Sequence, residues 1–107
     1  MISATTETIP GYNVVEVLGI ARGNVVRARA IGKDIMANLR SVVGGEIHEY
    51  TQLVAQSREH SVDRMQENAA EMGANAVIGV RFTTSVMMNG SAELLAYGTA
   101  VKIELVS

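Results

Sequence analysis

The chain has 107 residues, a formal net charge of -2 and no cysteine. This length predicts one domain spanning residues 1–107. Without a basic excess, nucleic acid is not an expected partner, because binding phosphates requires clustered Lys and Arg. The lack of cysteine excludes disulfides, thiolate metal ligands and cysteine nucleophiles. Since the chain is 48% hydrophobic but has one Phe and no Trp, we expect an aliphatic core.

The sequence also bears on the cellular compartment. The first 13 residues do not combine a basic start with an apolar run, so they do not have the pattern of a secretory signal. No apolar run approaches the ~20 residues that are needed to cross a bilayer. We therefore predict a cytoplasmic protein with no membrane partner.

The N-terminal part of the chain predicts two strands separated by a turn. A short strand is possible at Ile2 to Thr6, a turn is marked by Pro10 and Gly11, and a strand follows from Tyr12 to Ala21. This second strand is apolar on both faces, so it requires cover on both. One predicted face holds Val14, Leu18 and Ile20, and the other holds Val15, Val17 and Ala21.

Two helices are predicted next. From Arg27 to Val43 the apolar residues recur every three or four positions, which is typical of one helical face, and Gly44-Gly45 ends this helix. A second, longer helix is predicted from about Glu46 to Met72, and Gly73 closes it. Its buried stripe is expected to consist of Tyr50, Val54, Ser57, Ser61, Met65, Ala69 and Met72.

The C-terminal part predicts a β-hairpin around Asn89-Gly90, since this dipeptide between two strand-like segments favours a two-residue type I′ turn. Such a turn pairs Phe82 with Tyr97, Val80 with Thr99 and Ile78 with Val101, and it places all six on one face. The opposite face then carries Val77, Met87, Leu94 and Ala96.

Together these elements predict an α+β fold, in which a small antiparallel-rich sheet carries two helices packed on one face and ends in the C-terminal β-hairpin. Two helices can cover only one face of such a sheet. The aliphatic residues of the other face then have to be covered by other copies of the chain. We therefore expect a homo-oligomer that closes into a ring.

A segment after the double glycine contains the candidate metal ligands Glu46 and His48. A zinc-protease helix needs a second histidine four residues after the first, but Gln52 occupies that position. His60 follows His48 by twelve residues, which places it about 120° around the helix and roughly 18 Å along it. The two imidazoles could share an ion only across a subunit interface. Acidic residues in a first helical turn more often offset the helix dipole.

Other clusters also have ordinary explanations. Asp63, Glu67 and Glu71 form a carboxylate ladder that could bind a hard cation, although a solvated charged face is more common and Arg64 can pair with Glu67. Ser57 and His60 are one helical turn apart but have no orienting carboxylate. We therefore predict no enzyme, no catalytic residue and no cofactor-binding residue. The methionines that copper could use are more simply core or interface residues: Met65, Met72, Met87 and Met88.

Several features occur in a characteristic order along the chain. They are Gly19, Gly23, the "SVVGG" segment at residues 41–45, Tyr50, Arg58, "EMGANAVIGV" at residues 71–80 and "GTAV" at residues 98–101. Together they resemble the YbjQ-like family, small bacterial proteins of uncharacterised function labelled "putative heavy-metal-binding". The resemblance covers Val15 to Val101, most of the chain, and implies an α+β fold assembled as a homopentamer.

The resemblance does not supply metal ligands. Members of the family often carry a basic residue after the double glycine, where this chain has Glu46. They often carry alternating acidic residues along the following strand, where this chain has Arg81, Thr83 and Ser85. We therefore assign no metal ligand and predict a non-enzymatic homo-oligomeric ring. The alternative is a metal- or small-ligand-binding protein with sites at subunit interfaces, built from Glu46, His48 or His60.

Overall fold

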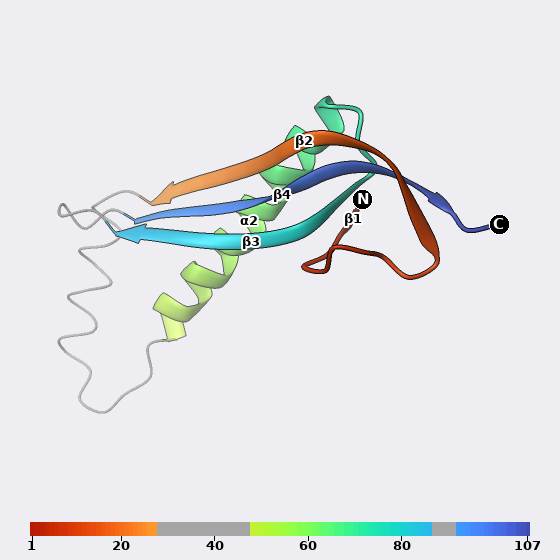
Figure 1. The fold of residues 1–107 in the computed structure, drawn as a ribbon. Helices are drawn as coiled ribbons and strands as arrows, with labels where there is room; N and C mark the ends of the chain where they lie inside the picture. The colour runs from red at the N-terminus through yellow and green to blue at the C-terminus, as the bar shows by residue number, and fades with distance from the viewer. Residues whose placement is uncertain (28–47, 87–91) are drawn as a thin grey trace.

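The computed structural model describes residues 1–27, 48–86 and 92–107 (Figure 1). Its strands follow the order β1-β3-β4-β2 in a single sheet. β1 pairs with β3 in parallel, whereas β3–β4 and β4–β2 are antiparallel. The predicted α+β class is confirmed, but the sheet is mixed rather than purely antiparallel. The elements are β1 (Ile2–Ser3), β2 (Tyr12–Arg27), α2 (His48–Glu71), β3 (Ala76–Val86) and β4 (Ala92–Leu105).

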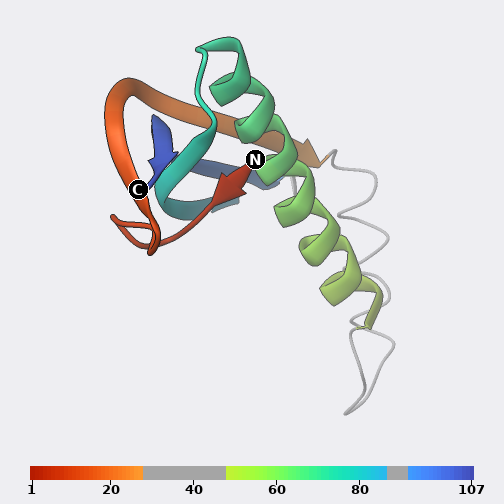
Figure 2. The same ribbon diagram turned by 90° about the vertical axis from the view of Figure 1, so that its right-hand side faces the viewer.

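The longer predicted helix is confirmed as α2, which packs on one face of the sheet (Figure 2). The described residues contain this one helix rather than the two predicted. The helix predicted from Arg27 to Val43 lies outside the described residues, apart from Arg27, which ends β2. From Ser57 to Ala69 the predicted stripe is buried as expected.

Gly73 ends α2 by adopting a φ of +91°, a left-handed conformation that glycine enters without a Cβ penalty. The N–H of Ala74 donates to the carbonyl of Ala69 at 3.0 Å, and the N–H of Gly73 donates to that of Ala70 at 3.0 Å. These two bonds form a Schellman motif and satisfy carbonyls that the end of the helix would leave unpaired. The predicted C-cap is therefore confirmed in detail.

The predicted hairpin register is wrong. Phe82 pairs with Ala96 rather than with Tyr97, and Arg81 takes the place opposite Tyr97. A bulge between Ile78 and Arg81 then shifts the pairing again, with Gly79 at a φ of +61°. The turn itself lies outside the described residues. In the observed register the small residues Ala96 and Ala100 of β4 pack in the cluster that contains Met65 and Ala69 of α2.

The new register changes which side chains need cover. Val77, Leu94 and Ala96, predicted to lie on the uncovered face, are buried, and Val77 and Ala96 belong to the cluster that packs against α2. β2 also contains two bulges, one between Val14 and Glu16 and one between Val17 and Gly19. They bring Leu18 to the side of α2, so the predicted division of the residues of β2 between two faces is wrong as well.

A second, smaller cluster lies on the opposite face of the sheet near the two chain ends. Ala76, Val101 and Ile103 are buried there, with Ile9, Tyr12 and Ile78 packed against them. The segment before β2 therefore covers part of the second face from within the same chain. The residues of this cluster do not need to be covered by another copy, so assembly would have to bury a smaller area of this face.

Gly23 sets the distance between α2 and the sheet. A Cβ built at this position would lie 2.3 Å from the backbone N of Met65 and 2.3 Å from the carbonyl oxygen of Ser61. Real Cβ atoms do not approach backbone atoms so closely, so any side chain here would push the helix outward. The neighbouring residues under α2 are small as well: Ala21, Ala96, Gly98 and Ala100.

We predict that Gly23→Ala lowers the free energy of unfolding by about 3 kcal/mol, the upper part of the range for overpacking, because the clash involves backbone atoms. Gly79→Ala is the matched control, since its Cβ meets nothing within 4 Å and its positive φ should cost only about 1 kcal/mol. Urea unfolding at one fixed protein concentration measures both. Equal losses for the two variants would contradict the packing role of Gly23.

Candidate functional site

The two candidate histidines, His48 and His60, belong to the same helix. α2 is one continuous helix that begins at His48 and includes His60, so the axial separation of roughly 18 Å applies. His60 is exposed on this helix. Glu46 and the side chain of His48 lie outside the described residues, so their role stays a prediction.

The carboxylate ladder is solvated. Asp63, Glu67 and Glu71 are all exposed, and the described part of the chain contains no group of three or more His, Cys, Asp or Glu that could hold a metal ion. Arg64, expected to be able to pair with Glu67, instead donates from Nη1 to the carbonyl oxygen of Asn24 at 2.7 Å. The arginine thus connects the helix to β2.

The methionines and the Ser57–His60 pair were the remaining candidates from the sequence. Met65 is fully buried in the main cluster, and Met72 packs against that cluster, so these thioethers fill gaps in the core. Met87 and Met88 lie outside the described residues. Ser57 is buried whereas His60 is exposed, an arrangement unlike the exposed nucleophile of a hydrolase.

A shallow hollow of about 310 Å³ lies between α2 and β3, with Val62 and Phe82 as its apolar members. We call it the Phe82 hollow; its lining residues are Arg58, Glu59, Val62, Asp63 and Phe82. Phe82 is the single phenylalanine of the chain and is 43% exposed. The sequence did not predict the hollow, because Phe82 was expected on the face of the hairpin covered by helices, whereas it lies beside α2 and is partly exposed. The only sequence signal was a large aromatic residue among polar neighbours, "RFTTS".

A row of exposed aliphatic side chains follows β2 on the sheet face opposite α2. The pairing of Val14 with Ile103, Val17 with Val101 and Ile20 with Thr99 places these β2 residues on one side. We call Val14, Val17 and Ile20 the β2 stripe. Val17 is 66% exposed and Ile20 is 63% exposed. Contiguous exposed apolar side chains of this kind mark candidate interaction surfaces.

The two edges of the sheet differ in how their outward-pointing backbone groups are hydrogen-bonded. At β2, the N–H of Arg22 donates to Oδ1 of Asn68 at 3.0 Å and the carbonyl of Asn24 accepts from Arg64, so α2 satisfies backbone groups that point away from β4. At β3, the N-terminal segment pairs only as far as Val80, whose N–H donates to the carbonyl of Ala4 at 3.0 Å. Beyond Val80, the described residues provide no strand on this edge.

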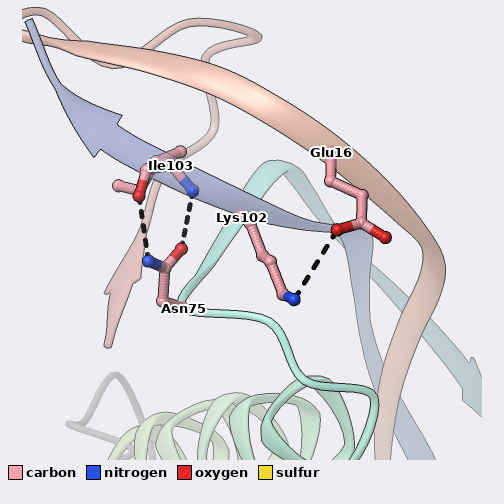
Figure 3. A network of polar contacts seen from close by, with 4 residues as sticks. All are labelled: Glu16, Asn75, Lys102 and Ile103. Carbon is pink, nitrogen blue, oxygen red and sulfur yellow. Dashed lines mark hydrogen bonds and ion pairs between the residues drawn. The ribbon is translucent and has the colours of Figure 1, made fainter.

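A polar cluster joins the strands near the chain ends (Figure 3). Asn75 makes a pair of hydrogen bonds with the backbone of Ile103: Nδ2 donates to the carbonyl at 3.0 Å, and Oδ1 accepts from the N–H at 2.7 Å. Lys102 Nζ lies 3.6 Å from Oε2 of Glu16. The side-chain amide of Asn75 binds the backbone of Ile103 in the way that a residue of a neighbouring strand would. We therefore assign this cluster a structural role.

No helix in the described part of the chain is long and apolar enough to cross a membrane.

Comparisons with known proteins place these features in a family. A family model, YbjQ_1, described as "Putative heavy-metal-binding", matches residues 1–104. A UPF0145 protein from Methanosarcina acetivorans is 56% identical over 103 residues, covering 96% of this chain and 97% of that protein. A UPF0145 protein from Thermococcus kodakarensis is 59% identical over 100 residues, covering 94% of this chain and 88% of that protein.

A solved structure shares the fold. The crystal structure of a protein of unknown function from Pediococcus pentosaceus, of the DUF74 family, aligns with a TM-score of 0.61 at 19% identity. The alignment covers 97% of this chain and 98% of that one. At this identity the likeness shows the fold alone.

We predict that Asn75→Ala lowers the free energy of unfolding by about 2 kcal/mol, because two hydrogen bonds to Ile103 are lost. The control is Glu104→Ala, which changes an exposed residue next to Ile103 on β4 and should have almost no effect on the free energy of unfolding. Thermal or urea unfolding measures the difference. A loss of similar size in both variants would refute the role given to Asn75.

Proposed function

The chain belongs to the YbjQ family, whose biochemical function is unknown, and on this premise we propose that it is a non-enzymatic protein that assembles with itself into a closed, pentameric ring. The pentamer is what the family resemblance implies. The non-enzymatic character rests on the sequence, from which no nucleophile, base and orienting residue can be assembled. We extend the proposal to a cytoplasmic location and to a partner set without nucleic acid or membrane.

The observation that supports assembly is the distribution of small and large side chains between the core and the surface. Among the residues whose burial is described, much of the core consists of alanine, glycine and serine, and the large side chains that are fully buried are those of Met65, Val77 and Val101. Many large aliphatic side chains are exposed instead. They include Val14, Val15, Val17, Ile20, Val26, Leu105 and Val106, together with the aromatic Phe82.

In one protomer, the exposed aliphatic side chains do not contribute the free energy that their burial would provide. Burying a Val, Leu or Ile side chain fully contributes about 1.5–3 kcal/mol, so several half-exposed residues together can offset the ~4–15 kcal/mol that association costs. Single exposed aliphatic residues are ordinary, but here three follow one another along the β2 stripe. Continuity of the row favours a specific contact.

The dimensions of the protomer support the same proposal. Its Cα radius of gyration is 17.2 Å, whereas a compact chain of this length has a radius of about 13 Å. Its principal extents are 58 × 25 × 15 Å, which is long and thin for a single domain. A two-layer unit of this thickness has few positions that are remote from solvent, and assembly would supply them.

We predict that sedimentation equilibrium at micromolar concentration gives a mass several times the 11.4 kDa of one chain. A clean 11.4 kDa species would refute the ring.

Changing both Val17 and Ile20 to Asp should shift the mass toward the monomer, because two carboxylates would have to be buried without partners. The matched control adds the same two charges at exposed polar positions, Thr8→Asp with Ser107→Asp, and should leave the assembly intact. A shift of equal size in both double variants would show that net charge, and not the β2 stripe, decides assembly.

The alternative is a metal- or small-ligand-binding protein with sites at subunit interfaces. The family description and the exposed position of His60 favour it. In a ring each residue occurs once in every copy, so side chains that are too far apart in one protomer, such as His48 and His60, can meet between neighbours. Imidazole and carboxylate together suit zinc, nickel, copper or cobalt.

Titration calorimetry with these four metals tests the alternative. If it is correct, at least one metal gives saturable binding to the wild-type oligomer, and His48→Ala or His60→Ala weakens it by about tenfold or more, since a primary ligand is removed. Gln56→Ala, an exposed change on the same helix, is the control. The absence of saturable heat, or binding unchanged in both histidine variants, would exclude this function for these residues.

A further inference from the structure

Residues 1–6 lie along the edge of β3, and we call them the N-terminal arm (Figure 2). β1, which is part of the arm, pairs with β3 in parallel through Ile2 and Ser3. After β1, three consecutive carbonyls of the arm accept hydrogen bonds from three consecutive residues of β3. The bonds run from Val80 N–H to Ala4 at 3.0 Å, from Arg81 Nη1 to Thr5 at 2.9 Å and from Gly79 N–H to Thr6 at 2.9 Å. The arm is therefore the partner of the N-terminal half of the β3 edge.

The bulge in β3 provides the donors for this contact. In a regular strand, consecutive N–H groups point to opposite edges, but Gly79 and Val80 both donate to the arm. The φ of +61° at Gly79 permits this, because glycine adopts positive φ without a steric penalty. Nη1 of Arg81 also donates to the carbonyl of Val80 at 2.8 Å, which positions the guanidinium beside the bulge. The bulge thus presents its donors on one side, and the arm accepts from them.

The arm contributes little to the hydrophobic core. None of residues 1–8 is buried, and the exposed fractions of Met1 and Ile2 are 48% and 39%. Its contact with α2 is polar as well, since Nε2 of Gln66 donates to Oγ of Ser3 at 2.8 Å. Water replaces hydrogen bonds of this kind when they open, so each of them stabilises the closed arm only slightly.

The chain is anchored again directly after the arm. Ile9 and Tyr12 pack against the second, smaller cluster, and the N–H of Tyr12 donates to the carbonyl of Ile9 at 3.1 Å. Gly11 turns the chain between them with a φ of +86°. Segments with few buried apolar contacts and with exposed hydrogen bonds open at a lower free energy than the core. The arm can therefore move about the connection at residues 7–8 while this cluster stays packed.

From these observations we infer that the N-terminal arm is a detachable strand, which opens as one unit while the rest of the sheet stays folded. Opening frees the N–H groups of Gly79 and Val80, together with the carbonyl of Val77, which accepts from Ala4 at 2.9 Å in the closed arm. The arm thus controls access to backbone groups that strand pairing uses. Arg81 holds the arm closed. The inference concerns a single chain and is independent of the proposed ring.

Hydrogen exchange of the wild-type chain, followed by NMR, tests this inference. The protection factors of the amides of Ala4, Gly79 and Val80, which lose their partners when the arm opens, are compared with those of β4, an inner strand of the sheet. We expect the three amides to have similar protection, at least about tenfold lower than that of β4. Protection equal to that of β4 would show that the arm does not detach. Low protection of Ala4 alone would show fraying of this segment without opening of the edge, and would also overturn the inference.

A pair of arginine variants tests how the arm is held. Arg81→Ala removes the bonds from Nη1 to Thr5 and Val80, and should lower the protection of the three amides about fivefold without changing that of β4. The matched control is Arg58→Ala, which removes an exposed arginine of α2 and should leave all the protection factors unchanged. No effect of Arg81→Ala, an equal effect of both variants, or a parallel fall in the protection of β4 would overturn the inference.

Discussion

The close approach of α2 to β2 at Gly23 is the constraint from which the other features of this protomer follow. The helix backbone lies so near the strand that a single methyl group would collide with it. Such contact requires small residues on both sides, and the chain supplies Ser61 and Ala69 from the helix and Ala21 and Ala96 from the sheet. The result is a core that is dense but poor in large side chains, and therefore limited in the hydrophobic free energy that it can contribute.

The same approach determines where the large side chains are found. The contact of α2 with β2 around Gly23 accepts only small groups, and Val14, Val17 and Ile20 of β2 lie on the outer face, whereas Phe82 lies in the open hollow beside the helix. Large aliphatic side chains exposed in this way are more typical of a subunit interface than of a solvent-facing surface. The exposed aliphatic residues and the thin protomer thus have one physical cause, and assembly is the simplest way to bury what the helix excludes.

Two polar side chains on α2 contribute to the fold by binding the backbone of β2. Arg64 and Asn68 belong to a helix rich in charge, where a reader of the sequence expects surface ion pairs. They reach over the edge of β2 and satisfy its backbone groups, which also limits edge-to-edge pairing there. Exposed carboxylates of the same helix stay in solvent. Within residues 1–27, 48–86 and 92–107, no group of three or more His, Cys, Asp or Glu could hold a metal ion.

Local signals in the sequence determined the α+β class, the position and C-cap of α2, and the presence of two long C-terminal strands. These depend on periodicity and on glycine, which act over a few residues. The register was decided only by tertiary structure. Bulges at Gly79 and within β2 each change the face of all the residues that follow, because side chains alternate strictly along a strand. Gly19 and Gly79 mark two of these bulges in the sequence, but glycine also ends helices and forms turns, so the sequence alone does not tell which glycine belongs to a bulge. For that reason the residues of the Phe82 hollow and the β2 stripe could be recognised only once the strands and the helix were in place.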